Sequence, residues 1–405
     1  MDAKKLPVRP SLDQYRKQAK ELLKTCKSGD SEAIQRIKRH HSQPSKAVDS
    51  RALSGKVTLA DAQLAIAREH AFESWPRFAK HIEALTHEDS AVSLFELAAD
   101  AVVVGDAATL KRLLRGNPAL IRERSARVHR ATLLHYLGAN GFEDYRQKSP
   151  KNAVEIARIL LSAGAEVDAV ADTYGKGTTL GLVATSIHPK LAGVQIALLA
   201  ALLEAGAAVD GVPGGLSPVI SALHNGRGEA AEFLAERGAN LDIEGAAGVG
   251  RLDLVRNFFN QDGNLKANTT KAQMESGFLW ACEYGRDNVV EFLLQRGVDL
   301  GAQANTGLTG LHWAVVGGQL ATIKLLVGRG APLEAKNAYG GTALGQALWS
   351  AMNGDSGIDY IPVIDMLIAA GAKVEPDSLA WLAQQRGASS TKVRLEALLR
   401  RHGAA

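Results

Sequence analysis

The chain has 405 residues, of which 46% are hydrophobic, and a formal net charge of +4 at pH 7. This length allows two or three ordinary domains or one long repeat array. No stretch approaches the roughly 18 consecutive apolar residues of a membrane span, and the first residues lack the apolar core of a signal peptide. The only cysteines, Cys26 and Cys282, lie far apart, which favours reduced thiols in a cytoplasmic protein.

The charge is unevenly distributed along the chain. Residues 1–85 carry 17 Lys and Arg against 10 Asp and Glu, a balance of 17 − 10 = +7, which leaves −3 for the remainder. A basic N-terminal module could meet an acidic partner or a nucleic-acid backbone. Because the sequence has no arginine-rich run and no nucleic-acid motif, we favour a solvated basic surface and keep nucleic acid as an alternative partner.

Residues 1–88 are predicted to form a small helical bundle. Apolar residues recur there at helical spacing, helix starts are indicated by Thr58 and by Ser74, and the polar stretch His40–Gly55 is predicted to be a loop. The apolar positions of the first predicted helix are Leu12, Tyr15, Ala19, Leu22, Leu23 and Cys26.

A repeated pattern dominates residues 268–334. The block Ser276–Arg286 and the block Thr309–Gln319 are each followed by a second apolar run and then by Gly297 or Gly330. Trp280 to Trp313 and Gly297 to Gly330 are both separations of 33 residues. A fixed period of this size is typical of stacked structural repeats.

This register, with Thr-x-Leu-His opening one helix and Leu-Leu-x-x-Gly closing the next, resembles the ankyrin repeat over roughly residues 93–374. The resemblance implies an all-α solenoid of about eight helix-pair units with β-hairpin fingers. It also implies an N-terminal capping module (1–88), a repeat array (89–374) and a C-terminal helical pair (375–405). The N-terminal segment is similar to a module that precedes ankyrin arrays in many bacterial proteins, and we expect it to cover the first repeat.

Several repeats depart from the regular pattern. Extra residues in the second, third and eighth units fall between the two helices of the unit, and we expect them to decorate the edge opposite the fingers. After Asn240–Ile243 the chain runs directly into Ala246-Ala247, so one finger is predicted to be missing.

Residues at recurring positions have predicted structural roles. Thr309 and Thr342 are placed to cap inner helices. The resemblance implies that His135 and His312 bond neighbouring backbone, and that Trp280 and Trp313 pack between inner helices.

The resemblance implies that a concave groove between finger tips and inner helices binds partners. Tyr284, Tyr339 and Trp349 fall in three consecutive units and could form one aromatic patch, as binding hot spots require; the alternative, that they lie against their own solenoid, stays open. The residues predicted to bind a partner are Glu283, Tyr284, Lys336, Tyr339, Trp349, His224, Asn225 and Asn305.

No motif for phosphate binding, dinucleotide binding or zinc chemistry is present, and Cys282 occupies a position that the repeat buries. We therefore predict no catalytic residue, no metal and no cofactor. The favoured function is a non-catalytic scaffold that binds a protein partner of unknown identity. The alternative is an enzyme or small-molecule sensor with a pocket near the missing finger, lined by His224, Asn225 and Tyr284.

Overall fold

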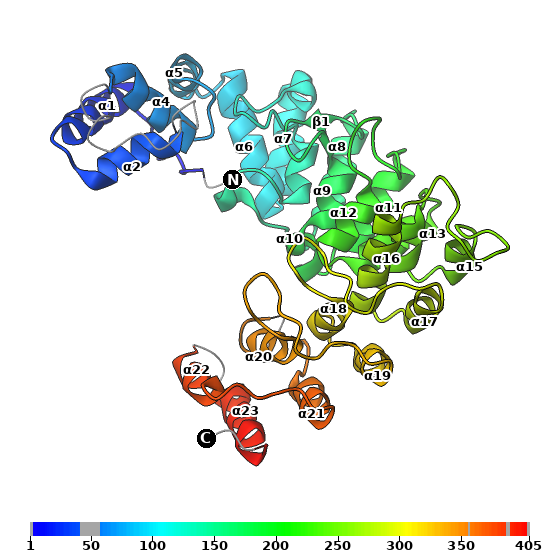
Figure 1. Ribbon diagram of the computed structural model, residues 1–405. Coiled ribbons are helices and arrows are strands. Elements are labelled where there is room, and N and C mark those ends of the chain that lie inside the picture. The colour runs from blue at the N-terminus through cyan, green and yellow to red at the C-terminus, as the bar shows by residue number, and fades with distance from the viewer. Residues whose placement is uncertain (1–2, 41–56, 355–356, 386–388, 403–405) are drawn as a thin grey trace. The chain divides into compact units, whose positions relative to one another are not determined.

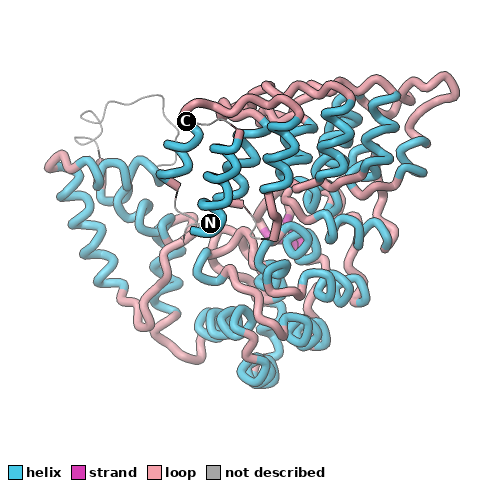
Figure 2. The backbone as a smooth tube through the Cα atoms, turned by 90° about the horizontal axis from the view of Figure 1, so that it is seen from below, coloured by secondary structure: helices cyan, strands magenta, loops and turns pink. Residues whose placement is uncertain are grey.

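The computed structural model describes residues 3–40, 57–354, 357–385 and 389–402. It is predominantly helical (Figures 1 and 2). The chain divides into two compact units, Met1–Gly238 and Ala239–Ala405, called here the N-terminal and the C-terminal unit. Among the described residues, no helix combines the length and the apolar composition needed to cross a lipid bilayer.

The N-terminal unit begins with a helical bundle that has its own apolar core. Its helices are α1 (Leu12–Lys27), α2 (Ser31–His40), α4 (Leu59–Glu69) and α5 (Trp75–Ala84). Tyr15, Phe72 and Phe78 pack in this core with edge-to-face contacts. Most of the predicted loop, residues 41–56, lies outside the described residues.

The rest of the N-terminal unit consists of helices in two rows. In one row α6, η2, α9 and α12 contact each other in turn, and in the other row α7, α8, α11 and α13 do so. The helices are α6 (Ala91–Val104), α7 (Ala107–Gly116), η1 (Pro118–Arg122), η2 (Leu134–Gly138), η3 (Asp144–Arg146), α8 (Ala153–Ser162), α9 (Thr179–Thr185), α10 (Ile187–Leu191), α11 (Gln195–Glu204), α12 (Pro218–His224) and α13 (Gly228–Glu236).

The second repeat differs from the expectation in two ways. Its inner helix is the short 3₁₀ helix η2 rather than a full α-helix. The insertion that follows was expected to decorate an edge, but Phe142, Glu143 and Arg146 within it are buried. The insertion is therefore part of the interior of the N-terminal unit.

The C-terminal unit also has two rows of helices. The helices α14, α16, α18 and α20 form one row, α15, α17, α19 and α21 form the other, and α23 packs on α20 and α21. The helices are α14 (Ile243–Gly248), α15 (Leu252–Arg256), α16 (Lys271–Glu283), α17 (Asp287–Gln295), α18 (Gly310–Val316), α19 (Leu320–Gly328), α20 (Ala343–Asn353), α21 (Ile361–Ala369), α22 (Ser378–Gln384) and α23 (Ser389–Arg401).

Local sequence sets the ends of these helices. The side chains of Thr309 and Thr342 accept hydrogen bonds from backbone N–H groups and cap α18 and α20, as predicted. Gly330 follows α19 with a φ of +82°, a conformation that glycine adopts without steric cost. In the C-terminal unit only residues 239–242 precede α14, and Asp242 caps that helix. These four residues leave no room for a finger before α14, in agreement with the sequence.

Fingers with regular strands are rarer than expected. Within the described residues, one finger forms a strand pair, β1 (Val170–Ala171) and β2 (Gly177–Thr178), which Figure 2 shows in magenta. Others carry only isolated bridges, such as Gln303 with Thr309.

Candidate functional site

A cavity of about 730 Å³ lies in the C-terminal unit between the loop before α20, the exposed side of α20 and the start of α22. We call it the C-terminal groove. Its lining residues are Asn337, Tyr339, Gly341, Gly345, Gln346, Leu348, Trp349, Glu375, Asp377, Ser378 and Trp381.

The loop that carries Tyr339 is held by its own side chains. The Asn337 Oδ1 atom accepts hydrogen bonds from the backbone N–H groups of Tyr339 and Gly341, both at 3.0 Å. This turn leaves Tyr339 at the tip with 87% of its surface exposed. A large aromatic side chain on a fixed turn is a binding element that loses little entropy on contact.

Helical periodicity turns Trp349 toward the groove that Tyr339 also lines. Leu348 is buried in the core of the unit, whereas its neighbour Trp349 points outward and is 52% exposed. Trp381 of α22 is only partly buried against the core, and it supplies a third aromatic side chain. The charged residues that line the groove, Glu375 and Asp377, are both acidic and exposed.

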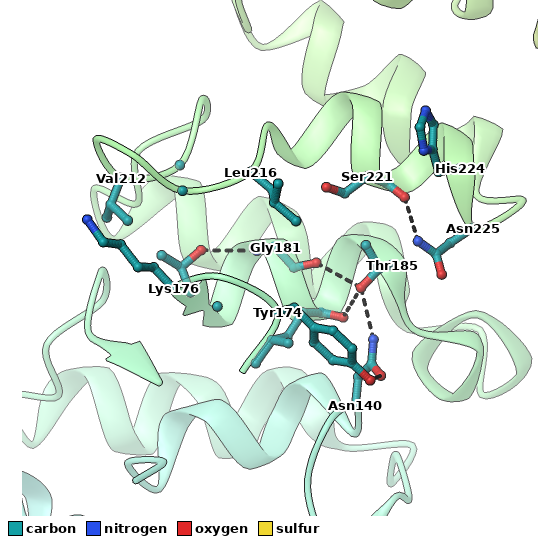
Figure 3. Close-up of a pocket in the computed structure, with 15 residues that line it drawn as sticks. Asn140, Tyr174, Lys176, Gly181, Thr185, Val212, Leu216, Ser221, His224 and Asn225 are labelled. Atoms are coloured by element: carbon teal, nitrogen blue, oxygen red, sulfur yellow. Dashed lines mark hydrogen bonds between the residues drawn. The ribbon is translucent and has the colours of Figure 1, made fainter. Parts of the chain in front are cut away.

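A smaller cavity of about 250 Å³ lies in the N-terminal unit and is drawn in Figure 3. We call it the N-terminal pocket. Its side chains come from the loop after η2, the β1–β2 finger, α9, the loop before α12, and α12 with the residue that follows it. The lining includes Asn140, Tyr174, Lys176, Thr185, Leu216, Ser221, His224 and Asn225.

The finger at the edge of this pocket has an unusual backbone. Tyr174, Gly175 and Lys176 have φ values of +45°, +64° and +70°. Left-handed conformations at non-glycine residues cost about 1–3 kcal/mol each and are found often at functional sites. This turn places Tyr174 and Lys176 at the pocket (Figure 3).

Polar groups of the pocket bond mainly to each other. The Asn140 Nδ2 group donates to Thr185 Oγ1 at 3.0 Å, and the Tyr174 hydroxyl donates to Asn140 Oδ1 at 3.3 Å. The Lys176 ammonium donates to the Pro213 carbonyl at 3.1 Å. The pocket therefore contains a preformed network of polar side chains, with one ammonium group on its wall.

A third feature of the N-terminal unit is a cluster of buried charges between α6 and the second repeat, called here the buried ion cluster. Arg127 Nε lies 2.9 Å from Glu143 Oε1, and Arg146 Nη2 lies 2.9 Å from Glu96 Oε2. Arg127 also pairs with Glu96, and Arg146 Nε pairs with Asp100 Oδ1 at 2.8 Å.

For the carboxylates of this cluster, the paired charges affect the pKa more strongly than burial does. Burial alone would raise the pKa of Glu96, but Arg127 and Arg146 lower it to about 2. The same balance, with Arg127 and His129 beside it, holds the pKa of Glu143 below its usual range. Burial lowers the pKa of His81, which lies near Glu96, to about 4. The guanidinium groups and carboxylates of the cluster pair with one another, and through His81 the cluster joins the N-terminal bundle to the first two repeats.

Comparisons with known proteins agree with this architecture. A family model described as ankyrin repeats (3 copies) matches residues 246–378, a range within the C-terminal unit. This is an ankyrin-repeat protein.

One curated relative is the palmitoyltransferase AKR1 of Lachancea kluyveri. It is 31% identical over 120 residues, or 27% of this chain, and the chain spans 16% of that relative's length. Among solved structures, the human ASB11 ankyrin repeat domain is similar, with 23% identity, a TM-score of 0.36, and coverage of 70% of this chain and 99% of the ASB11 chain. Ankyrin repeats generally mediate protein–protein interaction.

The structure brings together some of the residues predicted to bind a partner. Tyr339 and Trp349 line the C-terminal groove, and His224 and Asn225 line the N-terminal pocket. Asn305 and Lys336 are exposed but line neither cavity. Tyr284 is half-buried at the end of α16 and lines neither cavity, so it does not join Tyr339 and Trp349 there.

The role predicted for Glu283 in partner binding does not agree with its position in the structure. It was expected on the binding surface, but only 8% of its surface is exposed, because α16 is enclosed by the neighbouring helices α14 and α18. Its carbonyl oxygen accepts a hydrogen bond from Gln319 Nε2 at 3.1 Å. Glu283 is therefore a packing residue of this ankyrin-repeat protein.

The histidines and tryptophans at recurring positions occupy interior positions, as the repeat pattern implies. The His312 Nδ1 atom bonds Thr309 Oγ1 at 2.8 Å, and its Nε2 atom bonds the Gly341 carbonyl at 3.2 Å. Trp280 is buried, and its ring centroid lies 5.2 Å from that of Trp313.

Sequence reasoning missed the buried ion cluster. A signal was present in α6, an otherwise apolar helix whose only charged residues, Glu96 and Asp100, are four positions apart on one face. A carboxylate that such a helix largely buries, as it does Glu96, requires a charged partner. The insertion supplies one such partner in Arg146.

Proposed function

We propose that this ankyrin-repeat protein is a non-catalytic scaffold that binds a protein partner at the C-terminal groove. The observation that carries the proposal is the exposure of Tyr339 and Trp349 on a fixed loop and helix beside Trp381. Tryptophan and tyrosine dominate binding hot spots, and exposed aromatic side chains gathered in one cavity indicate an interaction site.

Rigidity of the groove supports the same proposal. The Asn337 turn holds the loop, the Thr342 side chain caps α20, and α23 packs on α20. A preformed surface keeps the entropy cost of association low. The match to the palmitoyltransferase covers too little of that relative, 16%, to support a transferase activity for this chain.

The proposal extends to the two ends of the chain and to its location. The N-terminal module (1–88) would cover the first repeat, which is supported by the contact of α5 with α6 and by the buried ion cluster. The C-terminal pair (375–405) would close the array and complete the groove through Trp381. Buried free thiols at Cys26 and Cys282 support a cytoplasmic role.

Site-specific photocrosslinking tests the proposal. A benzophenone amino acid at position 339 of the full chain, irradiated in lysate of the source organism, is expected to form a covalent adduct with a discrete protein. The same group at position 320 of α19 is the matched control, because Leu320 is exposed (37%) and does not line the groove. Adducts that are identical at both positions, or absent at 339, would contradict the proposal.

The N-terminal pocket supports a second candidate function, the binding of a small polar molecule. The hydrogen-bonded polar groups in its lining and the left-handed backbone of Tyr174 and Lys176 favour this role. The sequence predicted a small-molecule pocket lined by His224, Asn225 and Tyr284. His224 and Asn225 do line the N-terminal pocket, whereas Tyr284 belongs to the C-terminal unit. Native mass spectrometry of the purified chain is expected to show a bound small molecule that Lys176→Ala removes; bare protein alone would count against this candidate.

A further inference from the structure

The charges of the C-terminal groove indicate what kind of partner it takes. We infer that the groove binds a protein segment that presents a lysine or arginine side chain, received by the aromatic rings and by the carboxylates of Glu375 and Asp377. This inference rests on the proposed function and adds the chemistry of the partner to it.

Within the described residues, the two carboxylates of the groove lack the ion pairs that several other surface carboxylates of the same unit make. Glu291 pairs with Arg329 at 2.6 Å, Asp359 pairs with Arg394 at 2.9 Å, and Asp365 bonds His402 at 3.1 Å. Glu375 and Asp377 are exposed and have no ion-pair partner among the residues that the structure describes. Two uncompensated negative charges at one cavity attract a cation and repel an acidic segment.

The aromatic side chains favour the same occupant. A cation over the face of a tryptophan or tyrosine ring is stabilised by the ring quadrupole. The chain already uses this contact elsewhere, since Arg296 lies 4.9 Å from the ring centroid of Phe292. In the described part of the chain, no lysine or arginine lies over Tyr339, Trp349 or Trp381, so these ring faces are open to a cation from a partner.

Other occupants fit less well. A wholly apolar segment would remove the carboxylates of Glu375 and Asp377 from water without replacing their hydration, which is unfavourable. The N-terminal pocket has the opposite character, because its charged lining residue is Lys176 and no carboxylate lines it. A cationic segment is therefore expected to bind the C-terminal groove in preference to the N-terminal pocket.

The experiment uses a random-peptide display library on the intact chain, with counter-selection on the Tyr339→Ala/Trp349→Ala variant. We expect the surviving peptides to be enriched in lysine or arginine. For a synthetic peptide from this set, Glu375→Gln/Asp377→Asn is expected to weaken binding about tenfold, since each exposed charge pair contributes modestly and cation–π contact adds to it.

A charge-matched control separates local pairing from net charge. Asp262→Asn/Glu291→Gln removes two exposed carboxylates of the same unit that do not line the groove, and it is expected to leave affinity unchanged within about twofold. Replacing the cationic residue of the peptide by norleucine is expected to weaken binding to the wild type but not to Glu375→Gln/Asp377→Asn.

The outcomes distinguish the two proposals. Peptides that survive counter-selection but carry no cation, or that bind Glu375→Gln/Asp377→Asn as well as the wild type, would overturn the cationic partner and leave the protein-binding groove standing. If no peptide survives counter-selection, both proposals are overturned.

Discussion

Glu143 shows how a single side chain can organise a region of the fold. It is fully buried, lies 2.9 Å from Arg127 Nε and 3.4 Å from Arg146 Nη1, and accepts a hydrogen bond from the Tyr136 hydroxyl at 3.4 Å. Together with Glu96, its negative charge compensates the two buried guanidinium groups of Arg127 and Arg146. The cluster thus depends on each of its members, because a buried charge without its partner is strongly destabilising.

Glu143→Gln is therefore expected to destabilise the N-terminal unit by about 3–5 kcal/mol, because Arg127 and Arg146 lose one of two shared carboxylates. The change in stability is measured by urea unfolding, with hydrogen exchange of the amides in α6 as the readout. The control is Glu155→Gln, which breaks an exposed pair with Lys111 at 3.3 Å and should cost at most about 1 kcal/mol. Equal effects of the two substitutions would contradict the role assigned to the cluster.

The same residues predict a sensitivity to acid. Folding lowers the pKa of Glu96 from 4.5 to about 2 and that of His81 from 6.5 to about 4, so the unfolded chain binds more protons. Stability should fall as the pH decreases, through His81 between about 6.5 and 4 and through Glu96 between about 4.5 and 2. Urea midpoints measured from pH 7 to pH 4 test this; a midpoint for the N-terminal unit that does not change would be inconsistent with it.

At the scale of the element, the regular repeats could be predicted because their signals are local. Thr309 and His312 together fix the start of α18, and Gly330 fixes the end of α19. The second repeat could not be predicted in the same way. Its inner helix is shortened to η2, and its insertion makes charge contacts with α6, a segment about 45 residues earlier. Because these contacts join distant parts of the chain, no local sequence pattern indicates that the insertion is buried.

Close approach between α16 and α18 gives a prediction for one element. A Cβ atom added at Gly317 would lie 1.9 Å from the Glu283 carbonyl oxygen, whereas one added at Gly328 in α19 would meet nothing within 4 Å. Gly317→Ala is therefore expected to destabilise the C-terminal unit by about 2 kcal/mol or more. Gly328→Ala is expected to be neutral or to stabilise it by up to about 1 kcal/mol. Thermal unfolding of both variants measures the difference, and a tolerated Gly317→Ala would show that α16 and α18 are farther apart.

At the scale of the whole molecule, the N-terminal unit holds the N-terminal pocket and the C-terminal unit holds the C-terminal groove. The sequence pointed to Tyr339 and Trp349 through their repeat positions, and both line the C-terminal groove. It did not place Trp381 in the groove, because Trp381 lies in the final helical pair, where repeat register no longer applies. It also placed Glu283 and Tyr284 by repeat register alone, which does not report how far neighbouring helices cover a position.

Affinity capture from lysate of the source organism, with three forms of the full chain, tests the central claim most directly. These are the wild type, Tyr339→Ala/Trp349→Ala, and the control Tyr174→Ala/Leu216→Ala, which removes similarly exposed side chains from the N-terminal pocket. All three forms must first show the same helical circular dichroism. A protein partner is predicted to be retained by the wild type and by the control but lost by Tyr339→Ala/Trp349→Ala. Retention of the same proteins by all three forms, or a loss confined to the control, would contradict the C-terminal groove as the binding site.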